Sequence, residues 1–390
     1  MTFNSTKAFA DITQLYLEIP QTVQVRACEH SQSFSTLSRR WNAYLNQICL
    51  STFLPWLREE HIPSATPWSN AATSASIWEV VNGTAIVFGT TRMVLIPTEA
   101  IDLSELRVPQ EWVDIPTWAA DYYLATQVNP EEGWIKIAGY ATHEKLKTKG
   151  SYDVRDRTYS LDKEDLIPDL NILWVTRQLC PTETTRSVVT PLQSLTLVQA
   201  DNLIQRLGNT TVILPRLAVP FTIWGALLEH GGWRQRLYER RQSLPEQWSV
   251  LNWIVNGISD LAQQAGWVQM EPQSSLAGGR GVQEQLKPVL IKRLDIAGQQ
   301  YELRVLPQGK PEEQRWRFEL RNVALGKQIP AGFKLRLLTE DLQPFENNED
   351  RAITPVDLLY IEVAFNEPAE GLVWEVEPLP KNYQREILRF

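Results

Sequence analysis

Residues 215–241 read PRLAVPFTIWGALLEHGGWRQRLYERR, the densest mixture of aromatic, glycine and arginine residues in the chain. Apolar residues recur at helical spacing behind Pro220, which predicts a short helix with one broad apolar face. Gly231 and Gly232 then supply the left-handed or tightly turned backbone expected to end that helix. A second helix is expected to follow at a sharp corner, and the remaining chain is expected to be organised around this pair.

The second helix carries an arginine cluster. Trp233 and Leu237 lie four residues apart and are expected to face the core, which puts the arginines on the outward side. Guanidinium groups make bidentate contacts with carboxylates and phosphates, so this cluster is a candidate partner-binding surface. A solvated, salt-bridged helix face explains the same pattern, and both interpretations stay open. The candidate residues are Arg234, Arg236, Arg240 and Arg241.

Composition limits the class of protein. A chain of 390 residues with 43% hydrophobic residues is long enough for two or three packed domains. A net charge of -8 argues against nucleic acid as a partner. No long apolar run and no basic leader occur, which favours a cytoplasmic protein without a membrane contact. The three widely spaced cysteines indicate a reducing compartment, and neither a cofactor nor a metal is expected.

The first part of the chain mixes helical and strand patterns. A strong amphipathic helix is expected from Ser38, with Pro55 kinking or ending its regular part. Asn82-Gly83 predicts a type I′ hairpin between 77–81 and 84–88. A second hairpin is expected across NPEEG, between 122–127 and 134–138, and one more strand over 152–161. We therefore predict a domain over 1–270 that contains a small β unit at about 77–161.

Glycines mark the later boundaries. Residues 197–207 form an apolar helical stripe that Gly208 stops, and residues 251–265 predict one further amphipathic helix that Gly266 stops. Residues 271–286 have no periodicity and contain three glycines, so they are predicted to be a linker.

Beyond the linker the apolar period becomes two. Tyr301, Leu303 and Val305 alternate with polar residues, and the same alternation recurs around Trp316 and Trp374. About seven such strands in roughly 100 residues predict a β-sandwich over 287–390. The predicted fold class is α+β, with a mixed helical and antiparallel β region followed by an all-β sandwich-like domain.

Fifteen tryptophans make the chain tryptophan-rich. Exposed ones could stack on sugars or bases, but most fall on the apolar phase of a helix or strand, which favours core packing. The expected core tryptophans are Trp41, Trp224, Trp233, Trp316 and Trp374.

Four long blocks carry a family resemblance: RRWNAYLNQICLSTFLPWLREE, DYYLATQVNPEEGWIKIAGYATHEKL, SYDVRDRTYSLDKEDLIPDLNILWV and PRLAVPFTIWGALLEHGGWRQRLYERRQ. Together they resemble a family of uncharacterised cyanobacterial proteins catalogued as a domain of unknown function, over about residues 33–270. Members of that family are often encoded beside alternative sigma factors. The resemblance therefore implies a regulatory protein partner, with a sigma factor as the first candidate, and it supplies no catalytic residues.

Catalytic patterns are incomplete throughout. His143 begins HEKLK, which resembles a zinc-binding helix but has Lys147 where the second histidine must stand. Cys28 and His30 are neighbours in sequence, whereas a nucleophile and its base usually come from different segments. We therefore predict a non-enzymatic regulatory or adaptor protein that acts through protein contacts. The alternatives are a carbohydrate- or ligand-binding module on the sandwich and a cryptic hydrolase that uses His143 or His230.

Overall fold

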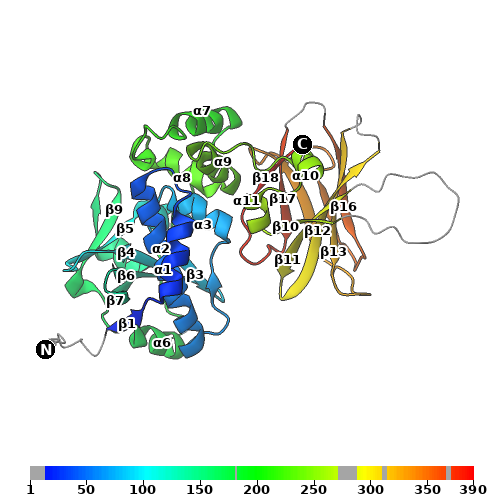
Figure 1. Ribbon diagram of the computed structural model, residues 1–390. Helices are drawn as coiled ribbons and strands as arrows, with labels where there is room; N and C mark the ends of the chain where they lie inside the picture. The colour runs from blue at the N-terminus through cyan, green and yellow to red at the C-terminus, as the bar shows by residue number, and fades with distance from the viewer. Residues whose placement is uncertain (1–13, 181, 271–287, 310–313, 366–369) are drawn as a thin grey trace. The chain divides into compact units, whose positions relative to one another are not determined.

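A computed structural model describes residues 14–180, 182–270, 288–309, 314–365 and 370–390 (Figure 1). The chain divides into two compact units. The first takes Met1–Ser69, Ser74–Ser194 and Gln205–Glu229, and the second takes Asn70–Thr73, Leu195–Ile204 and His230–Phe390. Both units are discontinuous in sequence.

The first unit is built on a six-stranded and a three-stranded sheet. In spatial order the larger sheet is β1 (Leu15–Glu18), β7 (Trp134–Thr142), β6 (Tyr122–Asn129), β4 (Thr91–Thr98), β3 (Thr84–Phe88) and β2 (Thr66–Pro67). The smaller sheet is β5 (Glu105–Pro109), β9 (Thr158–Asp162) and β8 (Ser151–Asp153). β4 and β6 pair in parallel, whereas the sequence predicted an antiparallel region; the other pairs are antiparallel. A crossover through β5 and α4 connects the parallel pair.

Helices accompany this unit. They are α1 (Gln21–Ser31), α2 (Leu37–Glu60), α3 (Ala71–Trp78) from Ser74 on, α4 (Gln110–Asp114), α5 (His143–Lys149), α6 (Leu170–Leu179) and α8 (Phe221–Glu229), with 3-10 turns η1 (Lys163–Asp165) and η2 (Pro215–Leu217). α2 starts where the Thr36 side chain accepts from the Arg39 N–H, and it packs against β3, β4 and β6 (Figure 1). Pro55 lies inside α2, which runs on to Glu60, so the helix does not end at Pro55.

The predicted hairpin around Asn82-Gly83 is wrong. Residues 77 and 78 end α3, and β3 pairs instead with β4. Gly83 has φ +121°, and its N–H donates to Asn46 Oδ1 at 2.9 Å. A Cβ at Gly83 would lie 2.5 Å from Trp112 Nε1, which donates to the Asn82 carbonyl at 2.9 Å. Gly83 therefore lets Trp112 approach the backbone closely, shortly after α3 ends. In the sequence alone, this Asn-Gly pair looks the same as a two-residue hairpin turn.

The second predicted hairpin is present as β6 and β7, and Gly133 in its turn has φ +74°. The single strand predicted over 152–161 is instead two strands, β8 and β9, that pair with each other. Arg157 between them has φ +53°, so the chain reverses there without a glycine to signal it.

The second unit contains two antiparallel sheets. One has the order β10 (Trp267–Met270), β11 (Val289–Ile296), β12 (Gln299–Gln308), β13 (Arg315–Asn322) and β16 (Leu359–Ala364). The other has the order β15 (Glu349–Arg351), β14 (Lys334–Thr339), β17 (Gly371–Glu377) and β18 (Ile387–Arg389). Aromatic side chains join them: the Phe390 ring contacts Trp316 and Phe318 of β13 at centroid distances of 4.9 and 5.8 Å. The predicted α+β class with a strand-rich carboxyl-terminal region is confirmed.

Three helices lie between His230 and the first strand of this unit: α9 (Gly231–Arg241), α10 (Val250–Asn256) and α11 (Asp260–Gln264). The sequence predicted one helix over 251–265, but Gly257 at φ +89° interrupts it and Ser259 caps a new start. α7 (Leu197–Leu207) belongs to this unit as far as Ile204. The compact unit includes residues 230–270, which the sequence analysis assigned to the first domain, and the predicted linker 271–286 lies outside the described residues.

Four of the five expected core tryptophans, Trp224, Trp233, Trp316 and Trp374, are at most 4% exposed. Trp41 is 45% exposed, so its assignment to the core is corrected. It lies in the first turns of α2 at the edge of the buried face, where its Nε1 donates to Glu99 at 2.6 Å and its ring stacks on Tyr44.

Candidate functional site

α9 is buried on nearly every side. A Cβ at Gly231 would lie 2.5 Å from the Arg385 carbonyl oxygen, and one at Gly232 would overlap the Ile387 side chain. Neither glycine is among the residues with positive φ, so the left-handed alternative is wrong. Both glycines lie in the first turn of α9, directly after the chain turns at His230. They are small because the chain at Arg385–Ile387 packs directly on the first turn of α9.

Because α9 is packed on nearly every side, the arginines do not lie together on an outward surface as the sequence predicted. Arg234 and Arg241 are each 2% exposed, Arg236 is partly buried, and Arg240 alone of the four is exposed. The predicted common outward surface is therefore wrong, because a helix with one packed side was assumed. Arg234 Nη2 donates to Gln384 Oε1 at 3.1 Å, and burial lowers the pKa of Arg234 to about 9.

Arg236 reaches an open groove of about 560 Å³ in the second unit. The groove is bounded by α7, by the chain after β14, by the end of β16 and by the start of β17. Its apolar walls are Leu197, Phe345, Val363, Ala364, Phe365 and Leu372. Its charged residues are two arginines, Arg236 and Arg389, and four carboxylates, Asp201, Glu340, Asp341 and Glu370. The carboxylates outnumber the arginines by two, and the groove's volume lies in the range of natural binding sites.

A chain of ion pairs fixes the groove's charged wall. Glu340, 5% exposed, binds Arg236 through one oxygen and Arg389 through the other, the latter at 2.6 Å. Arg236 also binds Asp201 at 2.9 Å, and Arg389 binds Glu246 at 3.3 Å. Burial is the largest single influence on Arg236 and lowers its pKa. The nearby carboxylates Glu340 and Asp201 outweigh it together, so the pKa of Arg236 is raised. Both arginines are therefore already occupied by carboxylates of this chain.

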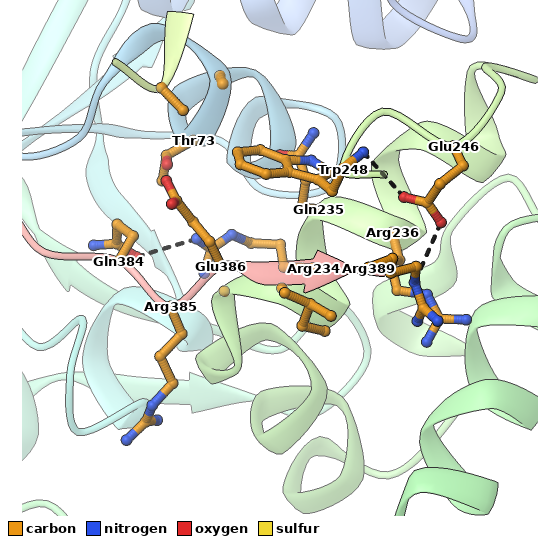
Figure 2. Close-up of a pocket in the computed structure, with 15 residues that line it drawn as sticks. Thr73, Arg234, Gln235, Arg236, Glu246, Trp248, Gln384, Arg385, Glu386 and Arg389 are labelled. Carbon is orange, nitrogen blue, oxygen red and sulfur yellow. Dashed lines mark hydrogen bonds and ion pairs between the residues drawn. The ribbon is translucent and has the colours of Figure 1, made fainter. Parts of the chain in front are cut away.

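A smaller pocket lies beside the network and is shown in Figure 2. It has room for about 20 Å³, enough for one water molecule. Arg234, Arg389 and Glu246 line it together with Trp248, whose backbone N–H donates to Glu246 at 3.1 Å (Figure 2). The size of this pocket suits structural hydration and leaves the larger groove as the candidate binding site.

A buried ion pair crosses the core between the two sheets. Lys292 on β11 binds Glu386, and the two residues are 9% and 7% exposed. The other Glu386 oxygen accepts from Trp267 Nε1 at 3.0 Å and from Trp374 Nε1 at 3.3 Å. Lys292 Nζ lies within 5.6 Å of both indole rings. The pair is therefore enclosed by two tryptophans, one from each sheet.

Glu239 gives the second unit an expected pH dependence. Burial raises the pKa of its carboxyl to about 8, and repulsion from Glu246 adds to the shift. An unfolded glutamate titrates near about 4.3, so the folded state binds the additional proton between these values. The contribution of Glu239 to the free energy of unfolding is therefore fully present below the unfolded pKa. It falls as the pH rises, by about 2 kcal/mol between pH 6.5 and 8. Urea unfolding at several pH values measures this slope.

The variant Glu239→Gln imitates the protonated carboxyl, and the loss of stability from pH 6.5 to 8 is expected to disappear in it. The exposed Glu346→Gln is the matched control and should keep the wild-type slope. Equal changes in stability from pH 6.5 to pH 8 in the wild type and in Glu239→Gln would contradict the prediction. His230 acts in the opposite direction, because burial lowers its pKa to about 3, and it removes stability as pH falls from about 6.5 toward that value.

The two histidines of the hydrolase alternative hold backbone groups. His143 is fully buried, with Nε2 2.9 Å from the Val113 carbonyl and Nδ1 accepting from the Ser187 N–H at 3.1 Å. His230 Nδ1 caps α9 by accepting from the Trp233 N–H at 3.3 Å. Each side chain therefore serves the local fold.

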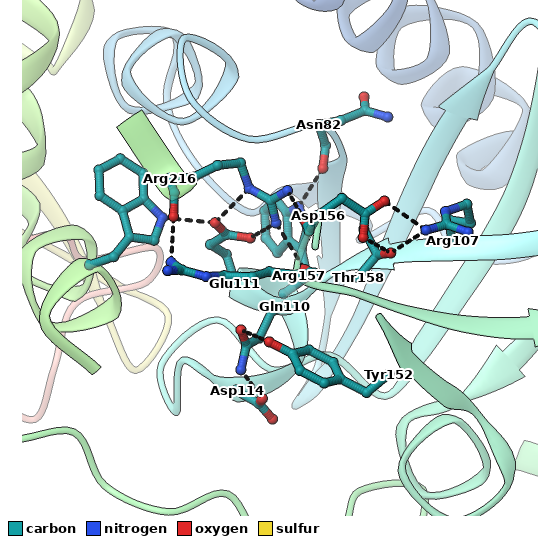
Figure 3. A network of polar contacts seen from close by, with 12 residues as sticks. Asn82, Arg107, Gln110, Glu111, Asp114, Tyr152, Asp156, Arg157, Thr158 and Arg216 are labelled. Carbon is teal, nitrogen blue, oxygen red and sulfur yellow. Dashed lines mark hydrogen bonds and ion pairs between the residues drawn. The ribbon is translucent and has the colours of Figure 1, made fainter. Parts of the chain in front are cut away.

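The first unit has a separate polar network, drawn in Figure 3. Glu111, 0% exposed, accepts from Arg216 through two hydrogen bonds of 2.9 and 2.7 Å and from Trp224 Nε1 at 2.7 Å (Figure 3). Arg216 also donates to the Arg157 carbonyl at 3.0 Å, and Arg157 donates back to the Arg216 carbonyl. These contacts tie α4 to the chain before α8, which is a structural role.

Sequence reasoning identified Arg236 and missed its partners. Glu340 is 104 residues away, and no local pattern connects the two. Lys292 did carry a signal, because it occupies the same face of β11 as the buried residues Leu290 and Leu294. A charged residue on the apolar phase of a strand indicates a buried partner.

The fold and groove define a two-unit α+β protein with a strand-rich second unit. The chain belongs to the family described as Protein of unknown function (DUF1822), whose model matches residues 17–389. The match thus extends over both units, well beyond residues 33–270. Searches of curated proteins and of solved structures each found no match.

Two kinds of feature are absent from the described residues. Among those residues, no cluster of three or more histidine, cysteine, aspartate or glutamate side chains could hold a metal ion. No described helix combines the length and apolar character needed to cross a bilayer.

Proposed function

We propose that this protein is a non-enzymatic adaptor that binds a partner protein through the groove of its second unit. The observation that carries the proposal is the groove itself, which combines apolar walls with a prearranged set of charges. Fixed charges beside apolar surface are typical of recognition sites, because the charges select the partner and the apolar area supplies affinity. The complex forms in the cytoplasm and has a regulatory role. A sigma factor is the first candidate for the partner.

Glu340 supports the groove's readiness for binding. It holds both arginines in place before any partner arrives, so little side-chain entropy remains to be lost on association. The sequence offered four arginines as a candidate surface for carboxylates or phosphates, beside the alternative of a solvated helix face. We now place partner binding at the groove, where Arg236 is the only one of these arginines in the lining. The negative net charge of the lining favours a basic partner.

The test is affinity capture from the native cell with two matched variants. Ala364→Trp places an indole in the groove, and Ala324→Trp places one on an exposed turn elsewhere in the same unit. Because both alanines are exposed, both variants are expected to melt near the wild-type temperature. Capture of the partner should fall at least about tenfold in Ala364→Trp and remain in Ala324→Trp. Equal capture by both variants would refute the groove as the binding site.

A small-molecule function is the second candidate, because the groove volume also suits an organic ligand such as a carbohydrate. Native mass spectrometry of the purified protein distinguishes the two. A bound compound lost in Ala364→Trp supports the ligand-binding alternative, whereas a bound polypeptide supports the adaptor.

A further inference from the structure

Beside the groove, no strand of the described residues pairs with the outer edge of β16. β16 pairs with β13 on one side and ends the five-stranded sheet (Figure 1). The Phe365 N–H donates toward β13, to the Gln314 carbonyl at 3.2 Å. Since backbone groups alternate along a strand, those of Tyr360, Glu362 and Ala364 point to the outer side.

The two ends of this outer edge differ. At Tyr360 the outward N–H donates to the Asp350 carboxylate at 2.9 Å, so the edge is closed there. At Glu362 and Ala364, no described strand pairs with the outer side. Both residues are exposed, and Ala364 also lines the groove. An edge with unpaired N–H and C=O groups is a template for another extended chain.

The groove beside this edge selects for charge. Its four carboxylates outnumber its two arginines, and both arginines are held by carboxylates of this chain. An acidic side chain would have to displace Glu340 or Asp201, whereas a basic one would meet the excess negative charge. Leu197 and Phe345 supply apolar surface for the neighbouring side chains.

We propose that the partner binds as an extended segment that pairs with the outer edge of β16 and places a lysine or arginine in the groove. This inference rests on the proposed function and specifies its chemistry. In such strand addition, main-chain hydrogen bonds give affinity and every second side chain gives specificity. Every second residue of the bound segment therefore faces the groove. The basic residue of that segment is expected to have apolar residues two positions before and after it.

The experiment starts from a phage-displayed library of random nine-residue peptides, selected on the immobilised full-length protein. Selected peptides are expected to carry lysine or arginine between apolar residues at alternate positions and to lose binding to Ala364→Trp. Replacing the basic residue of the best peptide by glutamate should weaken its binding at least about tenfold. Peptides that lack a basic residue, or a library without enrichment, would overturn the inference.

Backbone methylation tests the strand pairing itself. Two versions of the best peptide are compared, one methylated at the nitrogens of odd residues and the other at those of even residues. Only one set of N–H groups can face β16, so one version should lose binding at least about tenfold and the other should bind within about twofold. Equal effects of the two methylation patterns would exclude strand addition.

The two proposals fail separately. If Ala364→Trp loses the native partner while selection yields no basic, methylation-sensitive peptide, the strand inference falls and the adaptor function stands. If the native partner binds Ala364→Trp as well as it binds the wild type, both fall.

Discussion

Replacing Glu386 with leucine is expected to destabilise the second unit by about 3–5 kcal/mol, because it leaves Lys292 buried without its carboxylate. The same change removes the acceptor of two indole N–H groups, those of Trp267 and Trp374. Urea unfolding followed by tryptophan fluorescence gives the free energy, and hydrogen exchange read by mass spectrometry assigns the loss to residues 288–390.

Two further variants separate the charge effect from a loss of packing. The double change Lys292→Met with Glu386→Leu removes both charges and is expected to recover most of the stability, since a well-packed apolar pair often matches a buried ion pair. Glu362→Ala removes an exposed carboxylate 3.7 Å from Arg317 and should cost less than about 1 kcal/mol. A single Glu386→Leu variant as stable as Glu362→Ala would show that the buried pair contributes nothing.

Replacing Glu111 with leucine is expected to have a similar effect on the first unit, about 3–5 kcal/mol. Arg216, whose side chain is 12% exposed, then loses its bidentate partner, and the Trp224 Nε1 donor loses its acceptor. A buried donor without a partner bears its full desolvation cost. The measurement is the same urea titration, with hydrogen exchange in α4 and α8 as the local readout.

The control for this prediction is Glu105→Ala. Glu105 pairs with Arg107 at 2.8 Å, but both side chains are about one-third exposed, so its loss should cost less than about 1 kcal/mol. If Glu111→Leu unfolds no earlier than Glu105→Ala, the network in Figure 3 does not stabilise the unit.

The α+β class could be predicted because hydrophobic periodicity is a local property of the sequence. The alternation of Tyr301, Leu303 and Val305 with polar residues predicts a half-buried strand from five residues alone. What failed depended on distant packing. A helical wheel cannot show how many sides of α9 are covered, so it could not show that Arg234 and Arg241 are buried or that Arg234 contacts Gln384. The Asn82-Gly83 pair matches a hairpin turn locally, yet α3 ends just before it.

The groove itself could be predicted only in part. Arg236 was chosen for its residue type, whereas its partners come from α7 and from the chain after β14. Ala364 gave no signal at all, because a small residue at a strand end becomes informative only once the edge and the groove are seen together.

The discontinuous second unit has a practical consequence for dissecting the gene. A clone that begins at His230 would encode both sheets and α9, and its product would still lack Leu197 and Asp201. Those two residues form one wall of the groove and one arm of its ion-pair chain. Such a truncated product could fold and still fail every binding assay, so negative results from carboxyl-terminal fragments would say nothing about the intact protein.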